Sequence, residues 1–144
     1  MEKQDTINLL KECDAGTKMA VSSIDDVIES VQDEKLYKVL NKSKANHTRL
    51  GNEIHEMLNE RGLAEKEPSV IASGMSWMKT NVKLSMEPSD SMIADLMTDG
   101  CNMGVKSLNK YLNQYEAAEE KTKDITKRLI NLEEKLAVDI RKFL

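Results

Sequence analysis

Aromatic residues, glycine, proline and cysteine are all scarce in this sequence. Of its 144 residues only 3% are aromatic, and there are six glycines, two prolines and two cysteines. A chain so poor in aromatic and turn-forming residues, and so rich in Leu, Lys, Glu and Met, is typical of an all-helical protein. Cys13 and Cys101 are too few for a disulfide framework, so we expect reduced thiols.

Long apolar runs and an excess of basic residues are also missing. The first five residues, Met1 to Asp5, lack the apolar stretch of a signal peptide, and no run is long enough to span a bilayer. We therefore expect a cytoplasmic protein that does not associate with membranes. The net charge is −4, with both signs interspersed, which argues against binding to nucleic acid because that needs a basic stripe.

Apolar residues recur at alternating spacings of three and four in most of the chain, which predicts amphipathic helices. Asp5 or Thr6 is the expected N-cap of the first helix, Asp33 that of the second and Ser89 that of the fourth, while Gly62 should end the second. The length predicts one domain, 1–144. The expected helices cover residues 4–31, 34–61, 69–86, 89–115 and 119–143.

The order of these helices predicts how they pack. The connection between the first two is so short that they must form an antiparallel hairpin. A helix of ~26 residues is ~39 Å long, so only a long crossover can bring the chain back after the second helix. The fold class that we expect is therefore an all-α, ferritin-like four-helix bundle of two antiparallel hairpins, with a short fifth helix in the crossover.

This topology places one polar or reactive residue of each long helix at the same height. Counted from the end of the bundle where the chain starts, Thr17 lies about thirteen residues from the end of its helix. His47, Cys101 and Glu133 each lie about fourteen residues from that end of theirs. We call these four residues the mid-height layer. It lies where a bundle of this type would hold two metal ions.

The residues of the mid-height layer do not match a dinuclear site. Such a site takes a Glu from each of two helices and a Glu-x-x-His pair from each of the other two. Here Thr17 replaces the first Glu, Lys44 stands where the partner of His47 should be, and Cys101 (or Gly100) replaces the third-helix Glu. Glu133 has no histidine beside it. The two metal ions cannot be held.

The chain nevertheless resembles a bacterial ferritin-like family, a domain of unknown function that is similar to rubrerythrin-type bundles. Members of that family often carry acidic residues where this chain has Thr17, Lys18 and Cys101. The resemblance implies a fold and supplies no activity, and this chain does not retain the di-metal ligands. It rests on the helix order and on Leu9-Leu10…Cys13-Asp14, Gly74-Met75-Ser76-Trp77-Met78-Lys79 and Asp99-Gly100…Tyr111.

Two functional hypotheses follow. The first is a non-enzymatic bundle with no cofactor and no catalytic residues, which acts in a structural, interaction or stress-related role as a homodimer or higher homo-oligomer. In it, His47 is a satisfied core residue, hydrogen-bonded to a neighbour such as Thr17 or Ser43. The alternative is a metal- or cofactor-binding protein that holds a single zinc or iron ion at His47, Cys101 and Glu133.

Three further features carry their own expectations. Trp77 should either clamp the short helix to the bundle or mark a dimer interface. Gly100 and Gly104 should both face inward and permit close approach of another helix. Cys13 and Cys101 are more typical of small buried residues than of a reactive pair.

Overall fold

A computed structural model of the chain describes residues 1–63 and 88–144. These residues contain no strand, so the predicted all-α class is confirmed for them. The predicted short helix, 69–86, and Trp77 within it lie outside the described residues. The described elements are α1 (Glu2–Ile28), α2 (Glu34–Glu60), α4 (Asp90–Gln114), α5 (Glu120–Ile140) and the 3₁₀ helix η1 (Arg141–Phe143).

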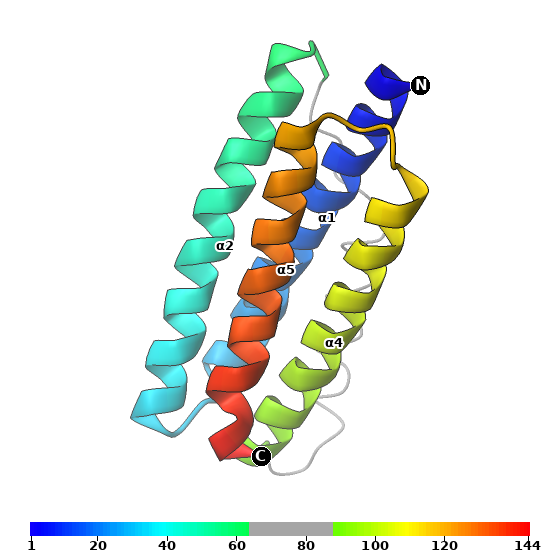
Figure 1. Cartoon of the computed structure of the whole chain (residues 1–144). Coiled ribbons are helices and arrows are strands. Elements are labelled where there is room, and N and C mark those ends of the chain that lie inside the picture. Colours follow the sequence, from blue (N-terminus) through cyan, green and yellow to red (C-terminus); the bar gives the residue numbers. More distant parts are fainter. Residues whose placement is uncertain (64–87) are drawn as a thin grey trace.

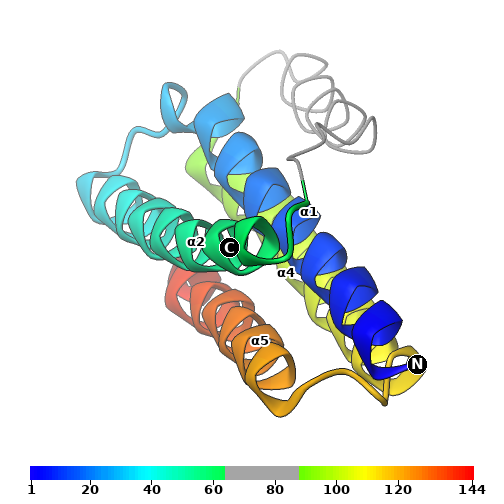
Figure 2. The same cartoon turned by 90° about the horizontal axis from the view of Figure 1, so that it is seen from above.

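The four helices form a bundle of two antiparallel hairpins. Figure 1 shows α1 and α2 running in opposite directions, as do α4 and α5, while α2 and α4 run in the same direction. Seen from above, α1 and α5 lie at opposite corners, and each of them packs against both α2 and α4 (Figure 2). Helices α1 and α5 also contact each other, and this pair runs in the same direction. The shared direction of α2 and α4 is the predicted relation between the hairpins.

Most helix ends follow the local signals in the sequence. The Asp33 carboxylate accepts hydrogen bonds from two backbone N–H groups of the first turn of α2, and the Ser89 hydroxyl accepts one from Met92. Gly62 follows α2 with φ of 70°, a left-handed conformation that glycine adopts without a steric cost. All three predicted positions are confirmed.

The predicted N-caps of α1 are wrong, because this helix begins earlier. Glu2 is its first residue, so Asp5 and Thr6 lie inside the helix. Their side chains instead hold the connection between α4 and α5. The Asp5 carboxylate accepts from the Ala117 N–H at 3.0 Å, and the Thr6 hydroxyl accepts from the Glu119 N–H at 2.9 Å.

A second set of hydrogen bonds between distant segments lies at the opposite end of the bundle, and we call it the Asp90 clamp. The backbone N–H groups of Gln32 and Asp33 donate to the two carboxylate oxygens of Asp90, at 2.8 and 2.9 Å. This contact fixes the α1–α2 connection against the start of α4. Helix α1 ends at Ile28, earlier than the predicted 31, although Val31 still packs against the core.

The core consists of two apolar clusters, one at each end of the bundle. Along each helix the mid-height layer falls between them or at the edge of one. Thr17, for example, lies between Cys13 of one cluster and Ile24 of the other. Burial of each large aliphatic side chain stabilises the fold by about 1.5–3 kcal/mol. Fully buried members include Leu9, Leu10 and Ile54 in one cluster and Ile24, Leu36, Leu40, Ile93 and Ile140 in the other.

The hydrophobic faces of these helices are narrow stripes, not continuous apolar surfaces. None of the helices in the described part of the chain is both long and apolar enough to cross a membrane. Their outer faces carry charged residues of both signs, as expected for amphipathic helices.

Candidate functional site

His47 is the central residue of the candidate site. It lies in the middle of α2 with 0% of its surface exposed. Its Nε2 is 3.1 Å from Glu133 Oε1 on α5, and its Nδ1 is 2.8 Å from the Ser43 carbonyl oxygen one turn earlier. The Ser43 hydroxyl lies 3.2 Å from the same Nδ1. Carboxylate and carbonyl oxygens only accept, so both contacts are satisfied only when both ring nitrogens carry a proton.

The electrostatic surroundings of His47 favour that doubly protonated form. Burial is the largest single influence and lowers its pKa, because it disfavours a charged ring. The hydrogen bond and the negative charge of Glu133, together with the bond to the Ser43 carbonyl, outweigh burial. The net result is a pKa raised above the ordinary 6.5. The protonated ring of His47 forms an ion pair with Glu133 in the core.

Glu133 also interacts with Cys101 on α4. Burial, the nearby charge of Glu133 and a hydrogen bond to Glu133 all raise the pKa of the Cys101 thiol. The thiol stays protonated and donates to the carboxylate, so it is a poor nucleophile. Gly104 lies beside this pair, and a Cβ there would be 3.5 Å from Glu133 Cδ. Its small size leaves room for the carboxylate between α4 and α5.

Three residues of the mid-height layer thus meet, and the fourth stands apart. The Thr17 hydroxyl donates to the Asp14 carbonyl of its own helix at 3.0 Å. It packs against Gly51, where a Cβ would lie 3.1 Å from Thr17 Oγ1. Of the two neighbours expected to bond with His47, Ser43 does so, while the contacts of Thr17 are to Asp14 and Gly51.

The residues at this level do not fit a dinuclear metal site. Lys44, which takes the place of a metal-ligating Glu, forms an ion pair at 2.5 Å with Asp25 of α1. The Glu133 carboxylate already accepts hydrogen bonds from His47 and Cys101. Within residues 1–63 and 88–144, no group of three or more His, Cys, Asp or Glu side chains is placed to hold a metal ion.

The two cysteines do not pair with each other. Cys13 belongs to one core cluster and Cys101 to the other, and both thiols are free. Cys13 Sγ lies 3.1 Å from Thr126 Oγ1. Burial is the main cause that raises the pKa of Cys13 to about 11, aided by the charges of Glu12 and Asp14. Neither thiol is activated.

The glycines of α4 behave differently from each other. Gly104 faces inward, as predicted, and its neighbour there is Glu133. Gly100 is exposed, and no atom of the described residues lies within 4 Å of the position that its Cβ would take. The prediction that Gly100 faces inward is wrong, because Cys101, one residue along the helix, takes the inward position.

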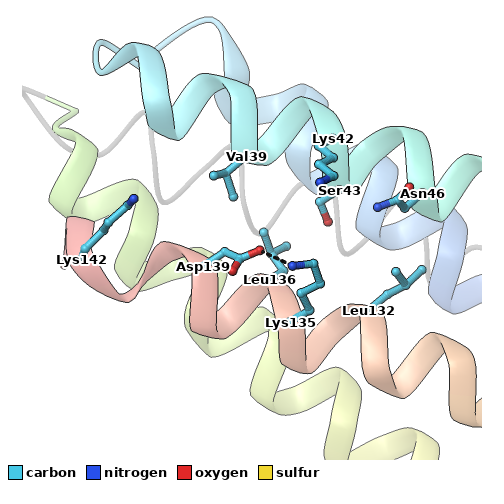
Figure 3. Close-up of a pocket in the computed structure, with 9 residues that line it drawn as sticks. All are labelled: Val39, Lys42, Ser43, Asn46, Leu132, Lys135, Leu136, Asp139 and Lys142. Atoms are coloured by element: carbon cyan, nitrogen blue, oxygen red, sulfur yellow. Dashed lines mark ion pairs between the residues drawn. The ribbon is translucent and has the colours of Figure 1, made fainter.

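A groove between α2 and α5 is a feature that the sequence analysis missed. Its volume is about 270 Å³. Val39 of α2 and Leu132 and Leu136 of α5 form its apolar walls (Figure 3). The residues that line it recur at helical spacing on both helices, a signal that could have been noticed. That spacing alone does not show whether the facing side chains of the two helices pack together or leave a space between them.

Polar side chains surround these walls. Ser43 and Asn46 of α2 face the side chains of α5, and Lys135 forms an ion pair with Asp139 at 3.2 Å (Figure 3). Two further lysines, Lys42 of α2 and Lys142 of η1, complete the lining. We call this feature the α2–α5 groove.

No protein-family model, curated protein or solved structure matches this chain. The described residues define its class as an all-α four-helix bundle with a buried polar layer.

Proposed function

We propose that this chain is a non-enzymatic, ferritin-like bundle protein that acts in a structural, interaction or stress-related role through self-association. The observation that carries the non-enzymatic part is the saturation of His47. The ring is fully buried, and both nitrogens already have partners in Glu133 and Ser43. A general base must reach its substrate, and a ring enclosed in this way has no such access.

The protonation states at this level support the same proposal. Both thiols have raised pKa values, so neither Cys13 nor Cys101 is poised as a thiolate nucleophile. Glu133 is occupied by hydrogen bonds from His47 and Cys101. The layer resembles a structural hydrogen-bond network, which fixes how helices pack, more than a catalytic group.

The topology supports the ferritin-like part of the proposal. Helices α2 and α4 run in the same direction, so α2 ends and α4 begins at opposite ends of the bundle (Figure 1). This relation distinguishes the ferritin-like arrangement from a simple up-and-down bundle. The bacterial ferritin-like family named above is the group whose fold the chain would share.

Exposed apolar side chains support self-association. Tyr37 on α2, Met103 on α4 and Val138 on α5 are 46%, 64% and 50% exposed. A second copy of the chain would remove such surface from water, which favours association. Light scattering coupled to size-exclusion chromatography, over a wide range of protein concentrations, tests this directly. A dimer or higher oligomer is expected, and a monomer at every concentration would refute self-association.

Binding of a single metal ion is the second candidate, because His47, Cys101 and Glu133 do meet in space. Elemental analysis and a visible absorption spectrum, after growth in medium supplemented with iron and zinc, separate the two. The first proposal expects no stoichiometric metal. Stoichiometric metal that is lost in His47→Ala but kept in His55→Ala would establish the second instead.

A further inference from the structure

We propose that the α2–α5 groove binds a small amphipathic anion, of the class of medium-chain aliphatic carboxylates. This inference does not depend on self-association or on the mid-height layer. It rests on the volume of the groove, the chemistry of its walls and the sign of the charge around it.

The volume of the groove sets the size of the ligand. About 270 Å³ is just below the ~300–1,000 Å³ found for small-molecule pockets, so only a small ligand fits. At roughly 30 Å³ per water molecule in the liquid, it has room for about nine waters. A ligand with about ten non-hydrogen atoms would fill it. A helix from a protein partner is too wide for a hollow of this size.

The apolar walls of the groove favour a ligand with an apolar chain. Val39, Leu132 and Leu136 face the groove from both sides. Leu136 is 3% exposed and belongs to the core cluster at this end, so the groove is continuous with packed apolar side chains. Inorganic anions gain nothing from such walls, whereas an alkyl chain is removed from water by them.

The charge around the groove selects an anionic head. Lys42, Lys135 and Lys142 contribute three positive charges, and Asp139 contributes one negative charge. The difference, +2, is opposite in sign to the net charge of −4 of the whole chain. Asp139 is paired with Lys135. Lys42 and Lys142 therefore supply the excess charge, and a carboxylate is the head group that such ammonium groups hold through charge-assisted hydrogen bonds.

Ser43 connects the groove to His47 and provides a local reporter. Its side chain lines the groove, and its hydroxyl lies 3.2 Å from His47 Nδ1. A ligand that displaces or bonds with this hydroxyl will change the NMR signals of the His47 ring. His55, two turns further along α2, is not part of the lining. It serves as an internal control within the same spectrum.

The experiment is a titration of the full chain with octanoate, followed by calorimetry and by the histidine ring signals. Octanoate should bind saturably and shift the His47 signals more than those of His55. Butyrate should bind at least tenfold more weakly, since each buried methylene contributes about fourfold in affinity. Octanamide, which has the same chain without the charge, should also bind at least tenfold more weakly.

Matched variants locate the site. Lys42→Gln with Lys142→Gln should weaken octanoate binding at least tenfold, whereas Lys106→Gln with Lys110→Gln on α4 removes the same charge from exposed positions and should not. Val39→Phe, which fills the groove without changing its charge, should also weaken binding.

The proposal would be overturned by no saturable binding of octanoate, by equal binding of octanoate and octanamide, or by equal affinities in the two lysine double variants. Inorganic phosphate that bound as tightly as octanoate would replace the amphipathic ligand with a simple anion, and so would also refute it. None of these results bears on the oligomeric state, which is measured separately.

Discussion

His47 and Glu133 are 86 positions apart in the sequence, yet their Nε2 and Oε1 atoms lie 3.1 Å apart in the middle of the bundle. A buried ion pair of this kind adds little net stability, because removing two charges from water costs about as much as their attraction returns. Its effect is greatest when one partner is lost. The other is then left buried without compensation.

His47→Ala should therefore lower the free energy of unfolding by about 3 kcal/mol or more, the cost typical of breaking a buried pair. His55→Ala removes a partly buried ring from the same helix and should cost less. Urea denaturation followed by circular dichroism measures both. Equal losses in the two variants would show that breaking the His47–Glu133 pair costs no more than removing an ordinary histidine ring from α2.

The pair should also make stability depend on pH. The pKa of His47 is raised in the folded state, so its contribution is fully present below the unfolded pKa of about 6.5. It is lost as the pH rises through the folded pKa. As the pH rises above about 6.5, wild-type protein should thus lose stability relative to Glu133→Gln, in which the charge that raises the pKa is absent. An unchanged difference between the two proteins across this range would contradict the assignment.

The cysteines should react slowly in the folded protein. Burial raises the pKa of both thiols, to about 11 for Cys13, so little thiolate exists near neutral pH. Cys13→Ser leaves Cys101 as the one thiol to follow with a disulfide reagent, and Cys101→Ser leaves Cys13. Glu133→Gln should speed the reaction of Cys101 more than that of Cys13, because the charge of Glu133 raises the pKa of Cys101 and does not contribute to that of Cys13. Equal acceleration of both would indicate general loosening of the fold.

Local sequence signals were sufficient for most of the helices and for the level of the polar layer. The spacing of apolar residues reports which face of a helix is buried, and helix length converts position into height. These two rules placed His47, Cys101 and Glu133 together. They failed at Gly100, because one residue turns the helix by about 100° and a narrow stripe does not decide between adjacent positions.

Contacts between distant segments were beyond those signals. Asp5 and Thr6 have the residue types of an N-cap, but their side chains bond to Ala117 and Glu119, more than a hundred positions away. Nothing near Asp5 in the sequence identifies that partner. The α2–α5 groove was missed for the same reason, since it depends on how closely two helices approach.

Asp90 should be important for holding the α1–α2 connection. Its carboxylate accepts from the N–H groups of Gln32 and Asp33, so Asp90→Ala removes two charge-assisted bonds at a partly exposed place. We expect a loss of about 1–2 kcal/mol. Asp95→Ala, at an exposed position of the same helix, should change stability by less than about 0.5 kcal/mol.

Hydrogen exchange distinguishes this local clamp from a general effect. The amides of Gln32 and Asp33 should exchange faster in Asp90→Ala, while those in the middle of α2 should follow only the global loss of stability. Unchanged exchange at both amides would mean that the clamp does not hold the connection in solution.

Two glycine substitutions should act in opposite directions. Gly100 is exposed inside α4, and a Cβ there would meet no atom of the described residues within 4 Å. Gly100→Ala should therefore stabilise the protein by about 0.8–1 kcal/mol through helix propensity alone, and raise Tm by about 3 °C.

Gly62 has φ of 70°, which costs an L-residue about 1–2 kcal/mol, so Gly62→Ala should lower Tm although space is available for the methyl group. Thermal unfolding followed by circular dichroism measures both changes. A loss of stability in Gly100→Ala would show that this position is covered, and that α4 presents an inward face there after all.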